Sequence, residues 1–116
     1  MCYCDDFERP KFYSATQRKA RKEHKCCECR NIIKPLEFYE RVFGKWDEIG
    51  EFKTCYFCLS FREYIQQNIP CFCWTFGDAL WQGAEVLEEY SYELPGLKFA
   101  GLRILAEGKR YYKMRG

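Results

Sequence analysis

Cysteines dominate the residues of this chain that could do chemistry. Its 116 residues include nine cysteines but only one histidine, His24. Four of the cysteines form two pairs with two residues between the sulfurs, and 25 residues separate the pairs. Zinc binds four thiolates in a tetrahedron, and this short spacing lets one tight turn present two of them to the same ion. The spacing therefore predicts a zinc site formed by Cys26, Cys29, Cys55 and Cys58.

The first pair leaves one assignment open, because Cys26 and Cys27 are adjacent in the chain. Either thiol can supply the first ligand, and Cys26 has the better spacing to Cys29. Turns of this kind commonly have glycine after the second cysteine, where the backbone becomes left-handed, but Arg30 and Asn31 follow here. Asparagine tolerates that conformation better than most residues, so we expect Asn31 to adopt it.

A second set of cysteines consists of two pairs with one residue between the sulfurs. An extended chain lets such a pair chelate one ion, so this set predicts a second zinc site; the alternative is that its members are ordinary buried or terminal thiols. The chain has many cysteines but no apolar signal segment, which favours metal ligation in a reducing cytoplasm over disulfide bonds. We therefore expect a cytoplasmic protein with one zinc or two. The second set is Cys2, Cys4, Cys71 and Cys73.

Catalysis is not expected from these residues. Four thiolates leave zinc no open coordination position, so the first site is interpreted as structural. His24 is a weaker candidate ligand, and a single histidine is too few for a metal nuclease. Cys55 and Cys58 have the spacing of a thioredoxin-type redox pair, but no βαβ pattern surrounds them. We predict a protein that is not an enzyme and has no catalytic residues.

The elements between and after the two pairs must position the zinc ligands. Residues 36–43 are rich in aromatics and lie between proline and glycine, which predicts a strand. Residues 44–50 then form a hairpin connection and residues 51–54 the return strand. From residue 55 apolar side chains recur with helical spacing up to Pro70, which predicts a helix. The helical stripe consists of Phe57, Phe61, Tyr64 and Ile65.

Helices also account for the C-terminal part of the chain. Thr75 and Asp78 have the spacing of a capping box, which predicts a second helix after them. Residues 97–106 fit a third helix slightly better than a strand. We interpret residues 1–17 as an arm and the basic run after it as one or two helical turns. The chain is then one domain, with a zinc-binding core and arm over 2–70 and a helical extension over 71–116.

The order of turn, hairpin and helix resembles a treble-clef zinc finger within a small α+β fold. The second cysteine pair then lies at a helix N-terminus, where the dipole favours thiolates. Residues 20–26, residues 37–41, Trp46 and residues 54–55 resemble small zinc-ribbon-type proteins encoded by tailed phages and prophages. The resemblance covers residues 2 to about 80. It implies zinc and a phage setting inside a bacterial host.

The net charge of the chain helps to decide between nucleic acid, membrane and protein as the partner. The formal net charge is +2, and one zinc bound by four thiolates would reduce it to 0. A basic run over residues 18–25 suggests an alternative function, a nucleic-acid-binding phage regulator with weak, sequence-indifferent binding. No apolar run approaches the ~20 residues that span a bilayer, so no membrane partner is expected. The residues of the nucleic-acid alternative are Arg18, Lys19, Arg21, Lys22 and Lys25.

A host protein or protein complex is the favoured partner, because the net charge gives little general attraction to nucleic acid. Exposed aromatic and acidic side chains would form the interface, since aromatic anchors dominate such surfaces. By analogy with small phage proteins, the partner would be a host defence complex such as CRISPR-Cas, and the protein an anti-CRISPR inhibitor. The candidate partner-binding residues are Trp46, Trp81, Glu88 and Tyr90.

Overall fold

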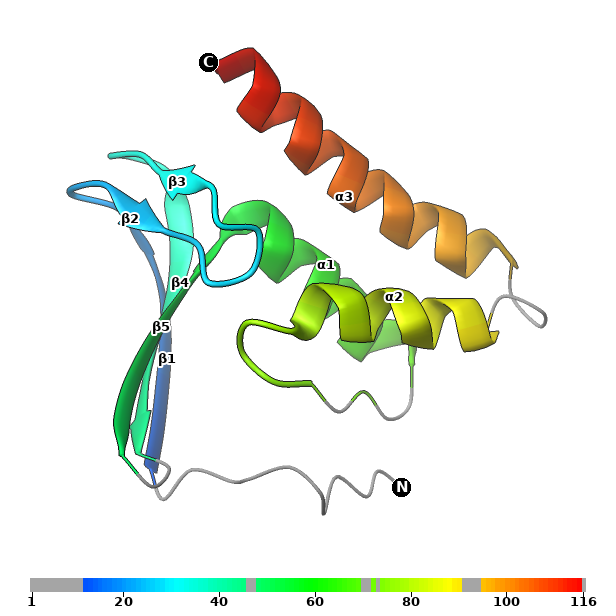
Figure 1. The fold of residues 1–116 in the computed structure, drawn as a ribbon, viewed down its shortest axis with the longest axis horizontal. Coiled ribbons are helices and arrows are strands. Elements are labelled where there is room, and N and C mark those ends of the chain that lie inside the picture. Colours follow the sequence, from blue (N-terminus) through cyan, green and yellow to red (C-terminus); the bar gives the residue numbers. More distant parts are fainter. Residues whose placement is uncertain (1–11, 46–47, 70–71, 73, 91–94, 116) are drawn as a thin grey trace.

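The computed structural model describes residues 12–45, 48–69, 72, 74–90 and 95–115. These residues form a small α+β fold in which an antiparallel sheet and a short ribbon stand beside three helices (Figure 1). The elements are β1 (Phe12–Lys19), β2 (His24–Lys25), β3 (Ile32–Ile33), β4 (Phe38–Lys45), β5 (Ile49–Cys55), α1 (Tyr56–Asn68), α2 (Ala79–Tyr90) and α3 (Pro95–Arg115).

The predicted hairpin is confirmed. Strands β4 and β5 pair antiparallel from Tyr39 opposite Cys55 to Lys45 opposite Ile49. The connection is shorter than expected, because Gly44 already lies opposite Gly50 within the ladder. Side chains alternate along a strand, and the hairpin therefore has one face toward α1 and one face away from it.

Two predictions are wrong for the residues that the structure describes: that residues up to 17 form an arm, and that the basic run after them forms helical turns. Phe12–Lys19 forms strand β1, which pairs antiparallel with β4 from Phe12 opposite Lys45 to Lys19 opposite Phe38. The side chains from Tyr13 to Lys19 are all exposed, so the segment has no apolar alternation. Backbone hydrogen bonds to β4 form this edge strand, and they leave no local pattern in the sequence.

The three helices follow the predicted order with different limits. In α1 the predicted stripe is confirmed, since Phe61 and Ile65 are fully buried. Helix α3 extends from Pro95 to Arg115, well beyond the expected residues 97–106. Proline is favoured in the first helical turn, and lysine, arginine and methionine are good helix formers, which explains both limits. None of the helices in the described segments combines the length and apolarity needed to cross a membrane.

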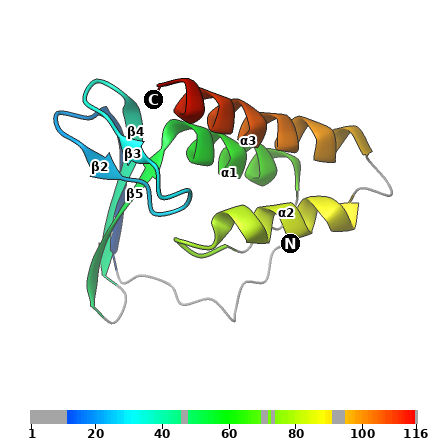
Figure 2. The same cartoon turned by 45° about the horizontal axis from the view of Figure 1, so that its top comes forward.

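Close packing joins the helices to one another and to the ribbon. Figure 2 shows α3 running along α1, and the packing leaves no room for a side chain at Gly108, where an added Cβ would lie 2.9 Å from Cβ of Phe57. The C-terminal end of α3 reaches the ribbon, where Arg115 donates to the backbone carbonyl of Ile32 at 2.8 Å. Arg115 also pairs with Glu37 at 2.7 Å, so the last turn of α3 is tied to the loop before β4.

Candidate metal centre

The first cysteine pair lies in the turn of the β2–β3 ribbon. The N–H of Cys26 donates to the carbonyl of Asn31 at 2.9 Å, and the N–H of Arg30 donates to the carbonyl of Cys26 at 3.2 Å. Arg30 has a φ of 67°, so it is the left-handed residue, and the expectation that Asn31 takes this role is wrong. The chain must reverse its direction directly after Cys29, because the carbonyl of Asn31 has to reach the N–H of Cys26. The left-handed residue is therefore the one that follows Cys29, which is Arg30.

The second pair lies where β5 meets α1. Cys55 is the N-cap residue of α1 in an extended conformation, and Cys58 is in the first turn. The positive end of the helix dipole and its free N–H groups face this corner. Both favour the anionic thiolate, but contact with the sulfurs of Cys26 and Cys29 raises the pKa of the two thiols, so a metal ion would have to displace their protons.

Both pairs meet in one cluster. The sulfur atoms of Cys26, Cys29, Cys55 and Cys58 all lie within 4.8 Å of one another. The sulfurs of Cys29 and Cys55 are 3.7 Å apart, too far for a disulfide. With zinc–sulfur bonds of about 2.3 Å, a regular tetrahedron has edges of about 3.8 Å, so the spacing fits four thiolates around one ion.

The surroundings of Cys26 support its place in the cluster. The sulfur of Cys26 accepts hydrogen bonds from the backbone N–H groups of Glu28 and Cys55, each at 3.4 Å. The contact with Cys29 opposes ionisation, but hydrogen bonds from Cys55 and Cys58 outweigh it and lower the pKa of the Cys26 thiol to about 6. A metal ligand must be a thiolate, and the two backbone N–H donors remain available to the Cys26 thiolate when all four cysteines are ionised.

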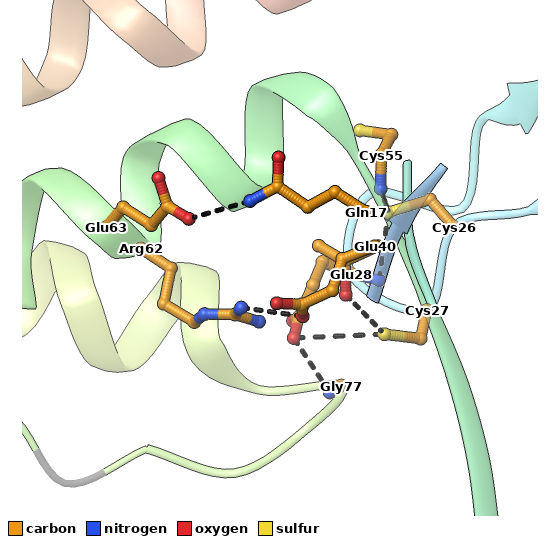
Figure 3. Close-up of polar contacts among 10 residues, drawn as sticks. Gln17, Cys26, Cys27, Glu28, Glu40, Cys55, Arg62, Glu63 and Gly77 are labelled. Carbon is orange, nitrogen blue, oxygen red and sulfur yellow. Dashed lines mark hydrogen bonds and ion pairs between the residues drawn. The ribbon is translucent and has the colours of Figure 1, made fainter. Parts of the chain in front are cut away.

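Cys27 lies outside the cluster. Its sulfur is 3.6 Å from the hydroxyl of Thr54 and points toward the carboxylate of Glu28 (Figure 3). Burial raises the pKa of the Cys27 thiol to about 11, so it stays protonated at neutral pH. The structure therefore gathers Cys26, and not Cys27, with the other three cysteines.

Glu28 connects this turn to α2, a role the sequence did not indicate. Its carboxylate accepts the N–H of Gly77 at 3.0 Å and the N–H of Ala79 at 3.1 Å (Figure 3 shows the first). Burial raises the pKa of Glu28, although both N–H donors favour its anion. The prediction that Thr75 and Asp78 form a capping box is wrong, because α2 begins only at Ala79. The N–H groups of Gly77 and Ala79, before and at this start, donate to Glu28 instead.

A buried ion pair holds α1 against the sheet beside the cluster. The guanidinium of Arg62 lies 2.7 Å from the carboxylate of Glu40, and both residues are buried (Figure 3). The ring of Trp74 stacks on Arg62 at 4.4 Å from the guanidinium carbon. Two nitrogens of Arg62, Nε and Nη1, have no hydrogen-bond partner among the described residues, so the charge depends strongly on Glu40.

The candidate partner-binding residues lie in different surroundings. Trp81 is 58% exposed on α2, Glu88 forms an ion pair with Lys98 of α3, and Tyr90 packs against the core between the helices. Trp46 lies outside the described residues. The same holds for all four cysteines of the second predicted zinc site, Cys2, Cys4, Cys71 and Cys73, so that site stays a prediction.

Four of the five predicted nucleic-acid-binding residues line one cleft of about 1240 Å³, and Lys25 is not among them. The sequence did not indicate that Arg41 and Lys53, from the sheet, line it too. His24 stacks near Tyr39 at 5.0 Å between ring centroids, and burial, Lys53 and Lys22 lower its pKa. The four predicted residues are Arg18, Lys19, Arg21 and Lys22.

Comparisons with protein-family models, with curated proteins and with solved structures found no match. The resemblance to phage-encoded zinc proteins therefore stays a prediction. The cysteine cluster and the cleft are the features from which a function can be argued.

Proposed function

We propose that the protein is a non-catalytic binding module with a treble-clef core built around one structural zinc ion. The proposal depends on one observation, the four cysteine sulfurs that lie within 4.8 Å of one another. The order of elements supports it: a turn between β2 and β3 carries one pair, the β4–β5 hairpin follows, and α1 begins at the second pair.

The donor set favours a structural ion over a catalytic one. Four thiolates complete the tetrahedral shell of zinc and leave no position for water or substrate. Three of the four residues are buried, and the group found among the described residues contains no histidine or carboxylate. A structural zinc contributes about 10 kcal/mol or more, comparable with the whole stability of a domain this size.

The ion would join separate segments of the chain at one largely buried point. It would bind the β2–β3 ribbon to the start of α1, and Glu28 extends that connection to α2 through its bonds to Gly77 and Ala79. The apolar residues around the cluster, Ala20, Ile33 and Tyr39, are buried but small in number. Folding of the ribbon and of the surfaces beside it is therefore expected to require the metal.

Elemental analysis of the full chain, purified without added metal, tests the proposal. We expect one zinc per chain from this cluster, and two if the second predicted site also binds. A chelator should abolish the near-ultraviolet signal of the aromatic side chains, and added zinc should restore it. Protein that contains no metal and yet keeps this signal in chelator would overturn the proposal.

A protein, the class of partner that the sequence favours, is our candidate for what the module binds. One observation favours it: Trp81 is 58% exposed and borders a cavity of about 340 Å³ lined by Phe57, Leu80 and Leu105. Exposed tryptophan beside an apolar cavity is typical of interface anchors. Trp81→Ala should then abolish inhibition of a host defence complex without changing zinc content, and unchanged inhibition by this variant would contradict the candidate.

A further inference from the structure

A basic cleft lies on the face of the sheet that points away from α1. Glu40 pairs with Arg62 of α1, so its neighbour Arg41 points to the opposite face. Lys53 lies opposite Arg41 on β5 and shares that face. Arg18 at the end of β1 and Arg21 in the next loop line the same cleft of about 1240 Å³. Residues from separate segments thus form one cationic surface.

The charge of this cleft differs strongly from that of the whole chain. Six lysines and arginines line it against one acid, Glu51, which gives a local net charge of +5 in a chain whose net charge is +2. Glu51 is itself held by Arg41 at 2.7 Å and by Lys53 at 2.9 Å. Local potential, rather than net charge, controls the attraction of a polyanion.

Exposed aromatic rings lie around the end of the sheet from the cleft, because Phe38 is two residues from Glu40 and shares its face, toward α1. Leu36 lines both the cleft and an adjoining apolar cavity of about 550 Å³, which Phe38 and Tyr56 also line. Phe38 is 55% exposed and Tyr56 57% exposed. The ammonium of Lys19 lies 5.6 Å from the centre of the Phe38 ring, so the charged and aromatic parts of the surface are in contact.

A tight turn marks the boundary between the two parts. Leu36 has a φ of 76°, a left-handed conformation that costs energy for a branched side chain, and it is nevertheless 75% exposed. Burial of this side chain therefore does not explain its conformation. The turn explains it instead: the N–H of Glu37 donates to the carbonyl of Lys34 at 3.1 Å, and a type II turn with Pro35 second requires a left-handed third residue.

We infer that the module binds single-stranded nucleic acid, with phosphates in the basic cleft and unpaired bases stacked on Phe38 and Tyr56. A cationic groove beside exposed aromatic rings is the combination that binds single strands without sequence readout. A duplex offers the same phosphates but keeps its bases paired, so it fits the aromatic part less well. The inference rests on the proposed function, since the zinc-held ribbon contributes His24 to the cleft and directly follows the loop with Arg21 and Lys22.

Fluorescence anisotropy with the zinc-loaded full chain tests the inference. The probes are labelled oligothymidylate and oligouridylate of about 20 nucleotides, a duplex of the same length, and polyglutamate. We expect both single strands to bind more tightly than the duplex, and polyglutamate not to compete with them. The ratio of affinities for the two single strands distinguishes DNA from RNA as the ligand.

Charge-neutralising variants locate the phosphates. Between about 50 and 200 mM salt, each phosphate contact contributes about −0.7 to the slope of log affinity against log salt. The double variant Arg18→Gln and Arg21→Gln should make the slope less negative by about 1.4. The matched control, Arg103→Gln with Arg110→Gln on exposed positions of α3, should leave the slope unchanged.

A second pair of variants locates the bases. Phe38→Ala should weaken single-strand binding by about tenfold with the salt slope unchanged, because stacking involves no counterions. Phe99→Ala removes a ring that is 68% exposed on α3 and should have no effect. Equal losses in the two phenylalanine variants, or equal affinity for duplex and single strand, would overturn the stacking assignment.

Zinc content, measured on every sample, separates failure of this inference from failure of the proposed function. Zinc-loaded protein that binds no oligonucleotide at about 50 mM salt would overturn the inference and leave the structural zinc intact. Competition by polyglutamate as effective as by oligothymidylate would also overturn it, in favour of an acidic protein partner. Absence of zinc from the purified protein would instead contradict the proposed function.

Discussion

The Glu28 carboxylate accepts a hydrogen bond from the backbone N–H of Ala79, 51 positions further along the chain. Glu28 lies between two cysteines of the candidate metal centre, and Ala79 is the first residue of α2. A carboxylate at this end of a helix satisfies free N–H groups and interacts favourably with the dipole. The turn that presents Cys26 and Cys29 therefore also sets the start of α2.

Replacing Glu28 by alanine should destabilise the zinc-loaded protein by about 1 kcal/mol, the usual cost of removing a helix cap. The metal should remain bound, because all four sulfurs remain. Urea unfolding followed by circular dichroism measures the first effect, and elemental analysis the second. Glu85→Ala, at an exposed position of α2, is the control and should change neither quantity. Loss of zinc from the Glu28 variant would show that the carboxylate acts on the metal.

Adjacent cysteines should differ sharply in their effect on the metal. Cys26→Ser removes a member of the four-sulfur cluster, so we expect loss of one zinc equivalent and of much of the tertiary structure. Cys27→Ser replaces a thiol that contacts Thr54, and we expect zinc content to remain unchanged. Elemental analysis of both variants measures the difference. Equal zinc loss in the two would mean that Cys27 exchanges with Cys26 as the ligand.

The second predicted zinc site can be tested without describing its structure. If Cys2, Cys4, Cys71 and Cys73 share an ion, serine at Cys2 and Cys4 should lower the zinc content by one equivalent. The cluster around Cys26 should keep its own ion, so circular dichroism in the near-ultraviolet should change little. Zinc content identical to that of the unchanged protein would identify these four as ordinary thiols.

Local spacing made the four-cysteine cluster and the hairpin predictable. A pair of cysteines with two residues between them and an aromatic segment between proline and glycine are each visible within ten residues of sequence. The stripe of Phe61 and Ile65 in α1 is predictable for the same reason, because a helix repeats its buried face every three to four residues. These features require no knowledge of distant parts of the chain.

Long-range contacts account for what the sequence did not reveal. Strand β1 forms through backbone pairing with β4, and its exposed side chains leave no periodic signal. Glu28 reaches the start of α2 across the fold, while the local candidates Thr75 and Asp78 contact each other at 3.4 Å. The basic cleft likewise adds Arg41 and Lys53 to the run that begins at Arg18. Net charge along the chain could not indicate this arrangement.

Glycine at position 83 allows α2 to approach α1 closely. A Cβ added there would lie 2.5 Å from Cδ1 of Ile65 and 2.7 Å from Cε2 of Phe61, two fully buried side chains. Overpacking of this kind costs about 1–3 kcal/mol, and the better helix propensity of alanine returns about 1 kcal/mol. We therefore expect Gly83→Ala to lower the free energy of unfolding by about 1 kcal/mol.

Gly96→Ala is the matched control for this substitution. Gly96 lies near the start of α3, and an added Cβ would meet nothing within 4 Å. Alanine should raise the free energy of unfolding there by about 0.5 kcal/mol, since it reduces the freedom of the unfolded chain. Urea unfolding of both variants checks the pair. A stable Gly83 variant would mean that the contact between α1 and α2 is looser than the distances indicate.

The buried pair of Arg62 and Glu40 should matter far more than the exposed pair of Arg41 and Glu51. Glu40→Gln leaves the Arg62 charge buried without its counter-ion, which costs about 3 kcal/mol for pairs of this kind. Glu51→Gln breaks a bond of the same length, 2.7 Å, but at a solvated position, where the expected loss is below about 1 kcal/mol. Urea unfolding of the two zinc-loaded variants makes the comparison, and similar losses would show that water reaches Arg62 in the folded protein.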